Sequence, residues 1–280
     1  MSACASLSRT FLPLVLFVTT GGALAGLWLG FGAHALVTAV AATWAVRTYW
    51  HATKDKAPAA IPSLAGAYGG PMFTALAATT WVLAGLNRWI VAGFFGAIEA
   101  GYFTLAGGAA VVLVSALGAV FMQYFQPGIF TLGDGSTGTD RTAVARRIDL
   151  VALVFACAGL AAVGVFALAA PWLVGPLIAE KYRAALPWIF PSGCFGVATI
   201  TTVFYQTLLL AGRRERACAP VELTTAAVLI LGCVVTAALG MEWLARWLVA
   251  TPLVPWLLTR PLARRFFFRP DAGATSAPAR

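Results

Sequence analysis

The chain has 280 residues, of which 60% are hydrophobic and only 10% are charged, and its formal net charge is +9. Soluble domains carry about 25% charged residues. This composition, with a mean hydropathy of +0.85, therefore excludes an ordinary soluble enzyme and indicates an integral membrane protein. The positive charge does not indicate a nucleic-acid partner, because cations in a membrane protein are first explained by their places beside the spans.

Apolar runs of about 20 residues, the length that crosses a bilayer as a helix, recur along the chain. They are too long and continuous for barrel strands, so we expect an all-α protein. Eight transmembrane helices are predicted, at about residues 11–30, 33–50, 66–86, 101–122, 150–170, 188–211, 221–240 and 243–260. They form one polytopic domain over residues 1–260, and residues 261–280 are expected to be a basic, disordered cytoplasmic tail.

The positions of Lys and Arg predict the orientation of the bundle, because cytoplasmic loops carry most of them. One side receives Arg9, Arg47, Lys54, Lys56, Arg141, Arg146, Arg147, Arg213, Arg214, Arg216, Arg260, Arg264, Arg265, Arg269 and Arg280. The other side receives Arg88, Lys181, Arg183 and Arg246. This asymmetry predicts that both termini face the cytoplasm and that the number of spans is even. On the cytoplasmic side, residues 141–147 are expected to contact anionic membrane lipids.

The first span has an alternative interpretation as a cleaved signal peptide. Arg9, the apolar stretch "FLPLVLFVTT" and the small-residue run "GGALAG" loosely fit the three regions of such a peptide. Cleavage would remove one span and spoil the alternation of charge between loops. A retained helix is therefore preferred.

Motifs for soluble catalysis or metal binding are scarce. The five cysteines form no Cys-x-x-Cys or Cys/His pattern, and His34 and His51 are expected on opposite sides of the membrane. The stretch "GDGSTG", residues 133–138, matches a glycine-rich dinucleotide pattern, but no strand precedes it, which favours a flexible loop. We therefore expect no cofactor, no bound metal and no enzymatic activity.

A family resemblance begins at Asn87, in "NRWIVAGFFGAIEAGYFTLA". This stretch resembles the Asp/Asn-Arg…Gly…Gly…Gly-x-Tyr pattern of polysaccharide flippases, the Wzx-like branch of the multidrug/oligosaccharidyl-lipid/polysaccharide exporter superfamily. The residues that carry the match are Arg88, Gly93, Gly96, Gly101 and Tyr102.

Two later blocks extend the resemblance, in the family's order. "APWLVGPLIAEKYRAALPWIFP", residues 170–191, is similar to the family's Ala-Pro…Gly-x-x-Tyr-x-x-Ala segment, although Ala179 stands where glycine is usual. "LLLAGRRERA", residues 208–217, resembles the family's exit from the following helix. Together the blocks cover about residues 60–260 and imply an exporter-like helical fold.

The resemblance implies a transporter that moves an isoprenoid-diphosphate-linked oligosaccharide from the cytoplasmic to the outer leaflet by alternating access. Arginine suits the diphosphate because its planar guanidinium donates paired hydrogen bonds. Polar side chains inside spans are expected to line a cavity or to join helices. The candidate substrate-binding residues are Arg88, Tyr102, Gln123, Tyr205, Gln206 and Arg246.

Structural roles compete with binding at several of these positions. Arg88 lies at the predicted end of the third span, where it can reach lipid headgroups while Asn87 closes the helix. Arg246 is flanked by two tryptophans, a grouping typical of the interfacial belt. Glu99 lies at the predicted start of the fourth span, where a negative charge favours the helix N-terminus.

The chain departs from the family in size, because members typically have 12 or more helices in two similar lobes. A second chain that supplies the missing helices is one expectation, and loss of transport is another. The alternative functions are a small-molecule or ion-coupled exporter of the same superfamily and a non-transporting scaffold in a polysaccharide-synthesis complex. In every case the predicted location is the bacterial cytoplasmic membrane.

Overall fold

The computed structural model describes residues 87–133, 138–173, 180–212 and 214–269, together with scattered single positions before residue 87. The chain divides into two units, Met1–Ala67 and Tyr68–Arg280. In the first unit the described positions are helical apart from a turn at Thr20. Most of the predicted spans 11–30, 33–50 and 66–86 lies outside the described residues, as do the signal-peptide alternative, both histidines and residues 134–137 of the glycine-rich stretch.

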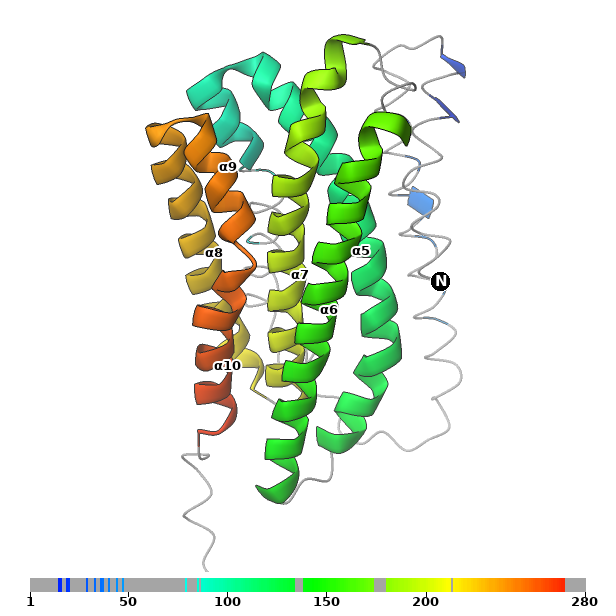
Figure 1. The fold of residues 1–280 in the computed structure, drawn as a ribbon. Coiled ribbons are helices and arrows are strands. Elements are labelled where there is room, and N and C mark those ends of the chain that lie inside the picture. Colours follow the sequence, from blue (N-terminus) through cyan, green and yellow to red (C-terminus); the bar gives the residue numbers. More distant parts are fainter. Residues whose placement is uncertain are drawn as a thin grey trace, which may run out of the picture. The chain divides into compact units, whose positions relative to one another are not determined.

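The second unit is built from long helices that alternate in direction (Figure 1). They are α5 (Ala97–Gly133), α6 (Gly138–Leu173), α7 (Ile189–Ala211) and α8 (Glu215–Leu239). A 3₁₀ helix, η1 (Glu180–Trp188), precedes α7. Within the described residues, four segments are long and apolar enough to cross a membrane: Ala97–Phe130, Arg141–Leu173, Glu180–Ala211 and Glu215–Leu239. They contain the predicted spans 101–122, 150–170 and 188–211 and all but the last residue of 221–240.

The eighth predicted span, 243–260, is not one continuous helix. It is divided into α9 (Met241–Ala250), the π-helix η2 (Pro255–Thr259) and α10 (Arg260–Phe267). Pro252 and Pro255 explain the interruption, because proline has no N–H to donate and its ring clashes with the preceding turn. Residues 261–267, expected in a disordered tail, belong to α10 instead, and residues 270–280 lie outside the described part.

The turn before α5 also differs from its prediction. Residues 87–95 are helical, so Asn87 does not close a helix, and the interruption falls at Gly96. Gly96 has φ +94°, a conformation open to glycine and costly for other residues. Glu99 lies in the first turn of α5, as predicted.

Helix α7 is the central element of the second unit, packed against α5, α6, α8 and α9. A close approach to α6 depends on Gly193, where an added Cβ would overlap the side chain of Val163. The outer helices instead expose large apolar side chains such as Val112, Leu168 and Leu231. Apolar outer faces are expected for helices that contact hydrocarbon.

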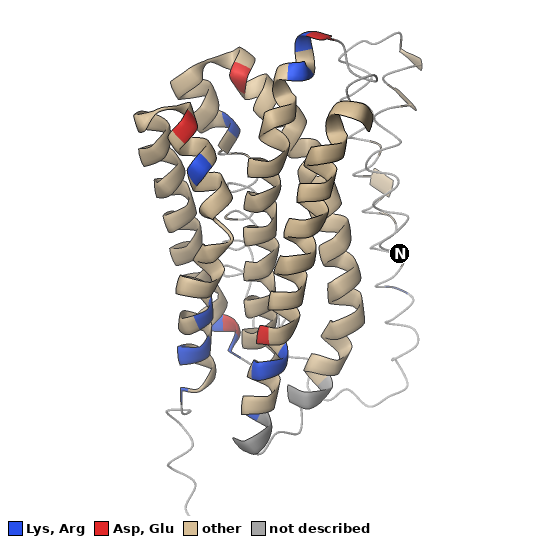
Figure 2. Ribbon diagram, viewed as in Figure 1, with Lys and Arg blue, Asp and Glu red and all other residues tan. Residues whose placement is uncertain are grey.

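Charged side chains lie at the two ends of the second unit (Figure 2). We call the end where α6 begins and α10 ends the basic end. Its described cations are Arg141, Arg146, Arg147, Arg214, Arg216, Arg260, Arg264, Arg265 and Arg269. Arg88, Lys181, Arg183 and Arg246 lie at the opposite end. The described part of the chain therefore separates its cations into the two groups expected from the sequence.

Candidate functional site

The densest polar cluster of the described residues lies at the basic end, around Asp149 of α6. Arg260 of α10 donates from Nε and Nη2 to the two carboxylate oxygens of Asp149, at 3.1 and 3.0 Å. Arg264, one helical turn further along α10, places Nη2 2.7 Å from Asp149 Oδ2. One carboxylate thus neutralises one of two guanidiniums, and the cluster keeps a net positive charge.

Aromatic residues of α7 and η2 support this ion-pair cluster. The fully buried Tyr205 donates its hydroxyl to Asp149 Oδ1 at 3.4 Å. Trp256 packs edge-on against the Tyr205 ring, with the ring centroids 6.2 Å apart. The Arg260 guanidinium lies 5.8 Å from the centroid of the Trp256 ring. Four helical elements therefore meet at Asp149, which favours a fixed geometry for both arginines.

A second polar layer joins α7, α8 and η2 close by. Gln206 donates to the buried carboxylate of Glu222, and the hydroxyls of Thr225 and Thr259 lie 2.9 Å apart. Because Tyr205 and Gln206 are adjacent in α7, they point about 100° apart and contact different neighbours. The two polar layers are therefore separate sets of contacts on α7.

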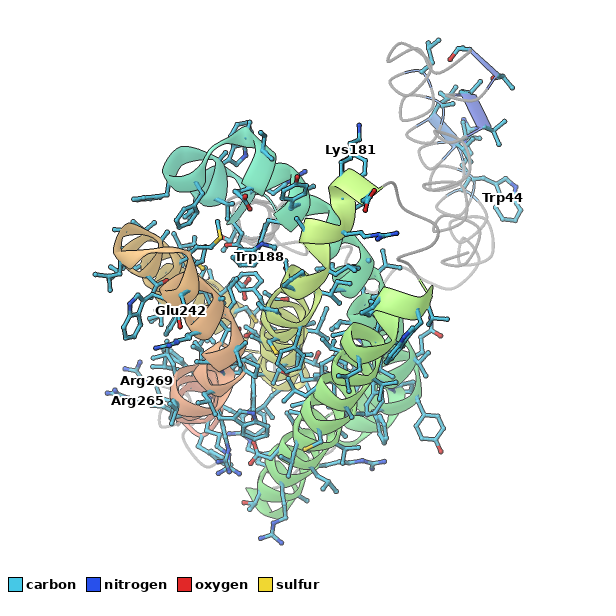
Figure 3. The ribbon with its side chains drawn as sticks, turned by 45° about the horizontal axis from the view of Figure 1, so that its top comes forward. Trp44, Lys181, Trp188, Glu242, Arg265 and Arg269 are labelled. Atoms are coloured by element: carbon cyan, nitrogen blue, oxygen red, sulfur yellow. The ribbon has the colours of Figure 1, made fainter. Side chains whose placement is uncertain are left out.

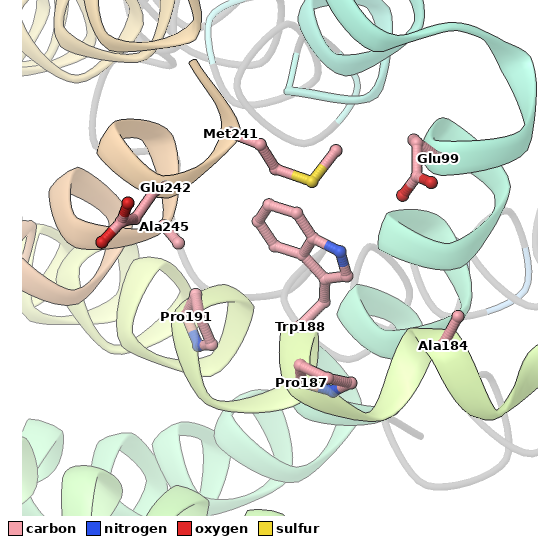
Figure 4. A pocket seen from close by; sticks show the side chains of 8 residues that line it. All are labelled: Glu99, Ala184, Pro187, Trp188, Pro191, Met241, Glu242 and Ala245. Atoms are coloured by element: carbon pink, nitrogen blue, oxygen red, sulfur yellow. The ribbon is translucent and has the colours of Figure 1, made fainter. Parts of the chain in front are cut away.

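The opposite end contains a cavity of about 480 Å³ (Figure 4). Its lining combines small, aromatic and acidic side chains: Glu99, Ala184, Pro187, Trp188, Pro191, Met241, Glu242 and Ala245. Figure 4 shows the indole of Trp188 between Met241 and Pro187, with Glu99 across from it. The two carboxylates can accept hydrogen bonds from hydroxyl or ammonium groups. The indole can donate one hydrogen bond from its N–H and can contact an apolar ring face.

The two acidic residues of this cavity have different surroundings. Glu242 forms an exposed ion pair with Arg246, which also lies 5.0 Å from the centroid of the Trp243 ring. Glu99 is half-buried, and among the described residues no cation forms an ion pair with it. Glu99 is therefore the carboxylate of the cavity that has no ion-pair partner among the described residues.

The structure brings together only some of the predicted binding residues. Tyr205 and Gln206 lie at the basic end, in the two polar layers described above. Arg88 and Arg246 are exposed at the opposite end, and neither is among the residues that line the cavity. Tyr102 is half-buried against the apolar cluster that contains Ile90 and Phe103. Gln123 is exposed on α5.

Sequence reasoning missed Asp149, Arg260 and Arg264 as a cluster. A signal was present, since Asp149 directly precedes the fifth predicted span and both arginines follow the eighth on the same side. Charge counting placed all three at one membrane face without showing which side chains pair. It also missed Glu222, which lies two turns into α8 because that helix begins at Glu215.

Within the described residues, no group of three or more His, Cys, Asp or Glu side chains could hold a metal ion. Cys157, Cys194, Cys218 and Cys233 are free thiols. Comparison with known protein families, with curated proteins and with solved structures gives no match for this chain.

Proposed function

We propose that this chain takes part in moving a lipid-linked oligosaccharide across the bacterial cytoplasmic membrane. One observation carries the proposal: two of the three segments that resemble polysaccharide flippases line the same cavity. Glu99 comes from the first segment, residues 87–106, while Ala184, Pro187, Trp188 and Pro191 come from the second, residues 170–191. Segments about 80 positions apart contribute to one hollow, which supports a shared binding role, although the lining residues are not those that carry the resemblance.

The chemistry of the cavity suits the sugar part of such a substrate. Carboxylates of Glu99 and Glu242 accept hydrogen bonds from hydroxyl groups, and Trp188 offers an apolar ring beside them. The volume falls in the range of about 300–1,000 Å³ that is usual for ligand pockets. The cavity would therefore hold a short portion of a glycan.

The diphosphate would lie outside this cavity, because carboxylates repel an anion. Arg88 is exposed at the same end of the unit and remains the candidate contact for it. The second unit contains six of the eight predicted spans, so we propose that it corresponds to one lobe of an exporter. A second chain would then supply the other lobe.

Gene deletion with complementation tests the proposal. Deletion is expected to reduce surface polysaccharide and to accumulate lipid-linked intermediates inside the cell. Complementation with W188A or E99Q should leave surface polysaccharide low and the intermediates accumulated. E180Q, which alters an exposed acid on η1 outside the cavity, should return both quantities to wild-type levels. Normal polysaccharide without accumulated intermediates in the deletion strain would overturn the proposal. If the deletion reduces polysaccharide but the W188A and E99Q chains both restore it, a scaffold role is favoured.

A second candidate function is export of a small organic cation, and Glu99 favours it. A half-buried carboxylate without a described cation partner, next to an indole, suits an ammonium group through charge and cation–π attraction. Efflux of ethidium from whole cells separates the two functions. Export of a cation predicts efflux that E99Q abolishes, whereas transport of an oligosaccharide predicts equal efflux with and without the chain.

A further inference from the structure

The basic end carries a second recognition site, distinct from the cavity. We propose that Arg260 and Arg264 form a phosphate-binding site, with Asp149 holding both guanidiniums in place and yielding when an anionic phosphate group arrives. The site goes beyond the proposed transport function, because it would take phosphate whether or not the chain moves a lipid-linked sugar.

Charge is the first argument. Two guanidiniums share the single carboxylate of Asp149, so one positive charge stays uncompensated within the cluster. The other described acids at this end are Asp140 in the first turn of α6, Glu215, which begins α8, and Glu222, whose carboxylate is bonded by Gln206. The local balance therefore favours an anion.

Access and donor capacity are the second argument. The side chain of Asp149 is 14% exposed, whereas those of Arg260 and Arg264 are 39% and 36% exposed. Each guanidinium has five N–H groups, and the bonds to Asp149 use only some of them. The Nε atom of Arg264 is buried and has no acceptor within the described residues, so the exposed Nη groups are the donors open to a second anion. The arginines therefore keep donors for a second anion.

Preorganisation is the third argument. Arg260 and Arg264 lie four residues apart, on one face of α10. Asp149 and the Trp256 ring hold Arg260, and Tyr205 holds Asp149. Paired guanidiniums with a fixed spacing match the geometry of a phosphate, which accepts several parallel N–H bonds. Such a group reaches a membrane protein either on a lipid headgroup or as a free anion.

Arg265 provides a matched control. It is exposed, it neighbours Arg264 in α10, and Figure 3 shows it with Arg269 at the outer edge of the bundle. R264Q and R265Q remove the same charge from the same helix. General attraction of a basic surface to anionic lipid therefore weakens equally in both variants, and any difference between them reports the site.

The experiment uses the full chain in nanodiscs of phosphatidylcholine, with or without phosphatidic acid. Bound phosphatidic acid is counted by native mass spectrometry, and inorganic phosphate is titrated separately into the phosphatidylcholine discs. We expect R264Q to lose about ten times more affinity than R265Q. Binding of phosphatidic acid alone assigns the site to lipid, and binding of inorganic phosphate assigns it to a soluble group.

Two further variants keep the test decisive. D149N removes the competing negative charge but keeps an amide oxygen that can accept from Arg260, so it should tighten binding of the phosphate group. R264K keeps the charge but loses the planar fork, and it replaces R264Q if that variant misfolds. Folding is checked by size-exclusion chromatography. Equal losses in R264Q and R265Q, weaker binding in a folded D149N, or no binding of either probe would each overturn the site.

Discussion

Asp149 and Arg260 lie 111 positions apart in the chain and form a two-armed ion pair between α6 and α10, with N···O distances of 3.1 and 3.0 Å. The pair connects the start of one membrane-spanning helix to the last helix of the described chain. It forms where the peptide leaves η2, so it fixes α10 after the interruption at Pro252 and Pro255.

Breaking this pair should destabilise the second unit. Removal of one partner from a buried ion pair costs about 3–5 kcal/mol. Because Arg260 is partly exposed, we expect about 1–2 kcal/mol for R260Q. The measurement is thermal or denaturant unfolding in detergent, in a double-mutant cycle with D149N. A coupling energy indistinguishable from zero would show that the two residues do not stabilise each other.

Close packing between α6 and α7 gives a second prediction. G193A places a methyl group against Val163 and should cost about 1–3 kcal/mol of unfolding free energy. The double variant G193A/V163A should recover part of this loss by making room. G108A is the control, because an added Cβ there meets nothing within 4 Å. Equal stability of the two single variants would contradict the packing described for α7.

The turn between α8 and α9 gives a third prediction. Gly240 has φ +125°, which side chains other than glycine rarely adopt. G240A should therefore lower stability by about 1–3 kcal/mol through backbone strain alone, since the space around the position is open. G93A, at an equally open position in the helix formed by residues 87–95, should be close to neutral. A similar melting temperature for both variants would argue against the strained turn.

The sequence was sufficient to predict the long helices, because hydrocarbon requires every backbone group to be bonded within its own helix. The spans within α5 to α8 follow from apolar length alone. The eighth predicted span is divided into shorter helices, because apolar composition remains high through Pro252 and Pro255 while the backbone does not stay regular. The two prolines determine where the helix is interrupted, and a hydropathy average does not detect this effect of proline on the backbone.

The candidate site was harder to predict. Tyr205 and Gln206 were singled out as polar residues of a span, yet their partners Asp149 and Glu222 depend on how α6 and α8 pack against α7. Side chains that meet over such separations cannot be paired from one sequence. Gln123 has the same polar chemistry but is exposed on α5. The sequence alone does not tell which face of α5 packs inward, so this difference could not be predicted.

The most direct test of the proposed function is movement of a fluorescent lipid-linked oligosaccharide in proteoliposomes. Label in the outer leaflet is reduced chemically, and protected label reports the inner leaflet. The proposal predicts faster exchange between leaflets with the wild-type chain, together with its partner chain if one is required, than in empty vesicles or with W188A. The proposal would be contradicted if the wild-type chain, folded and inserted together with any required partner chain, gave exchange no faster than that of empty vesicles.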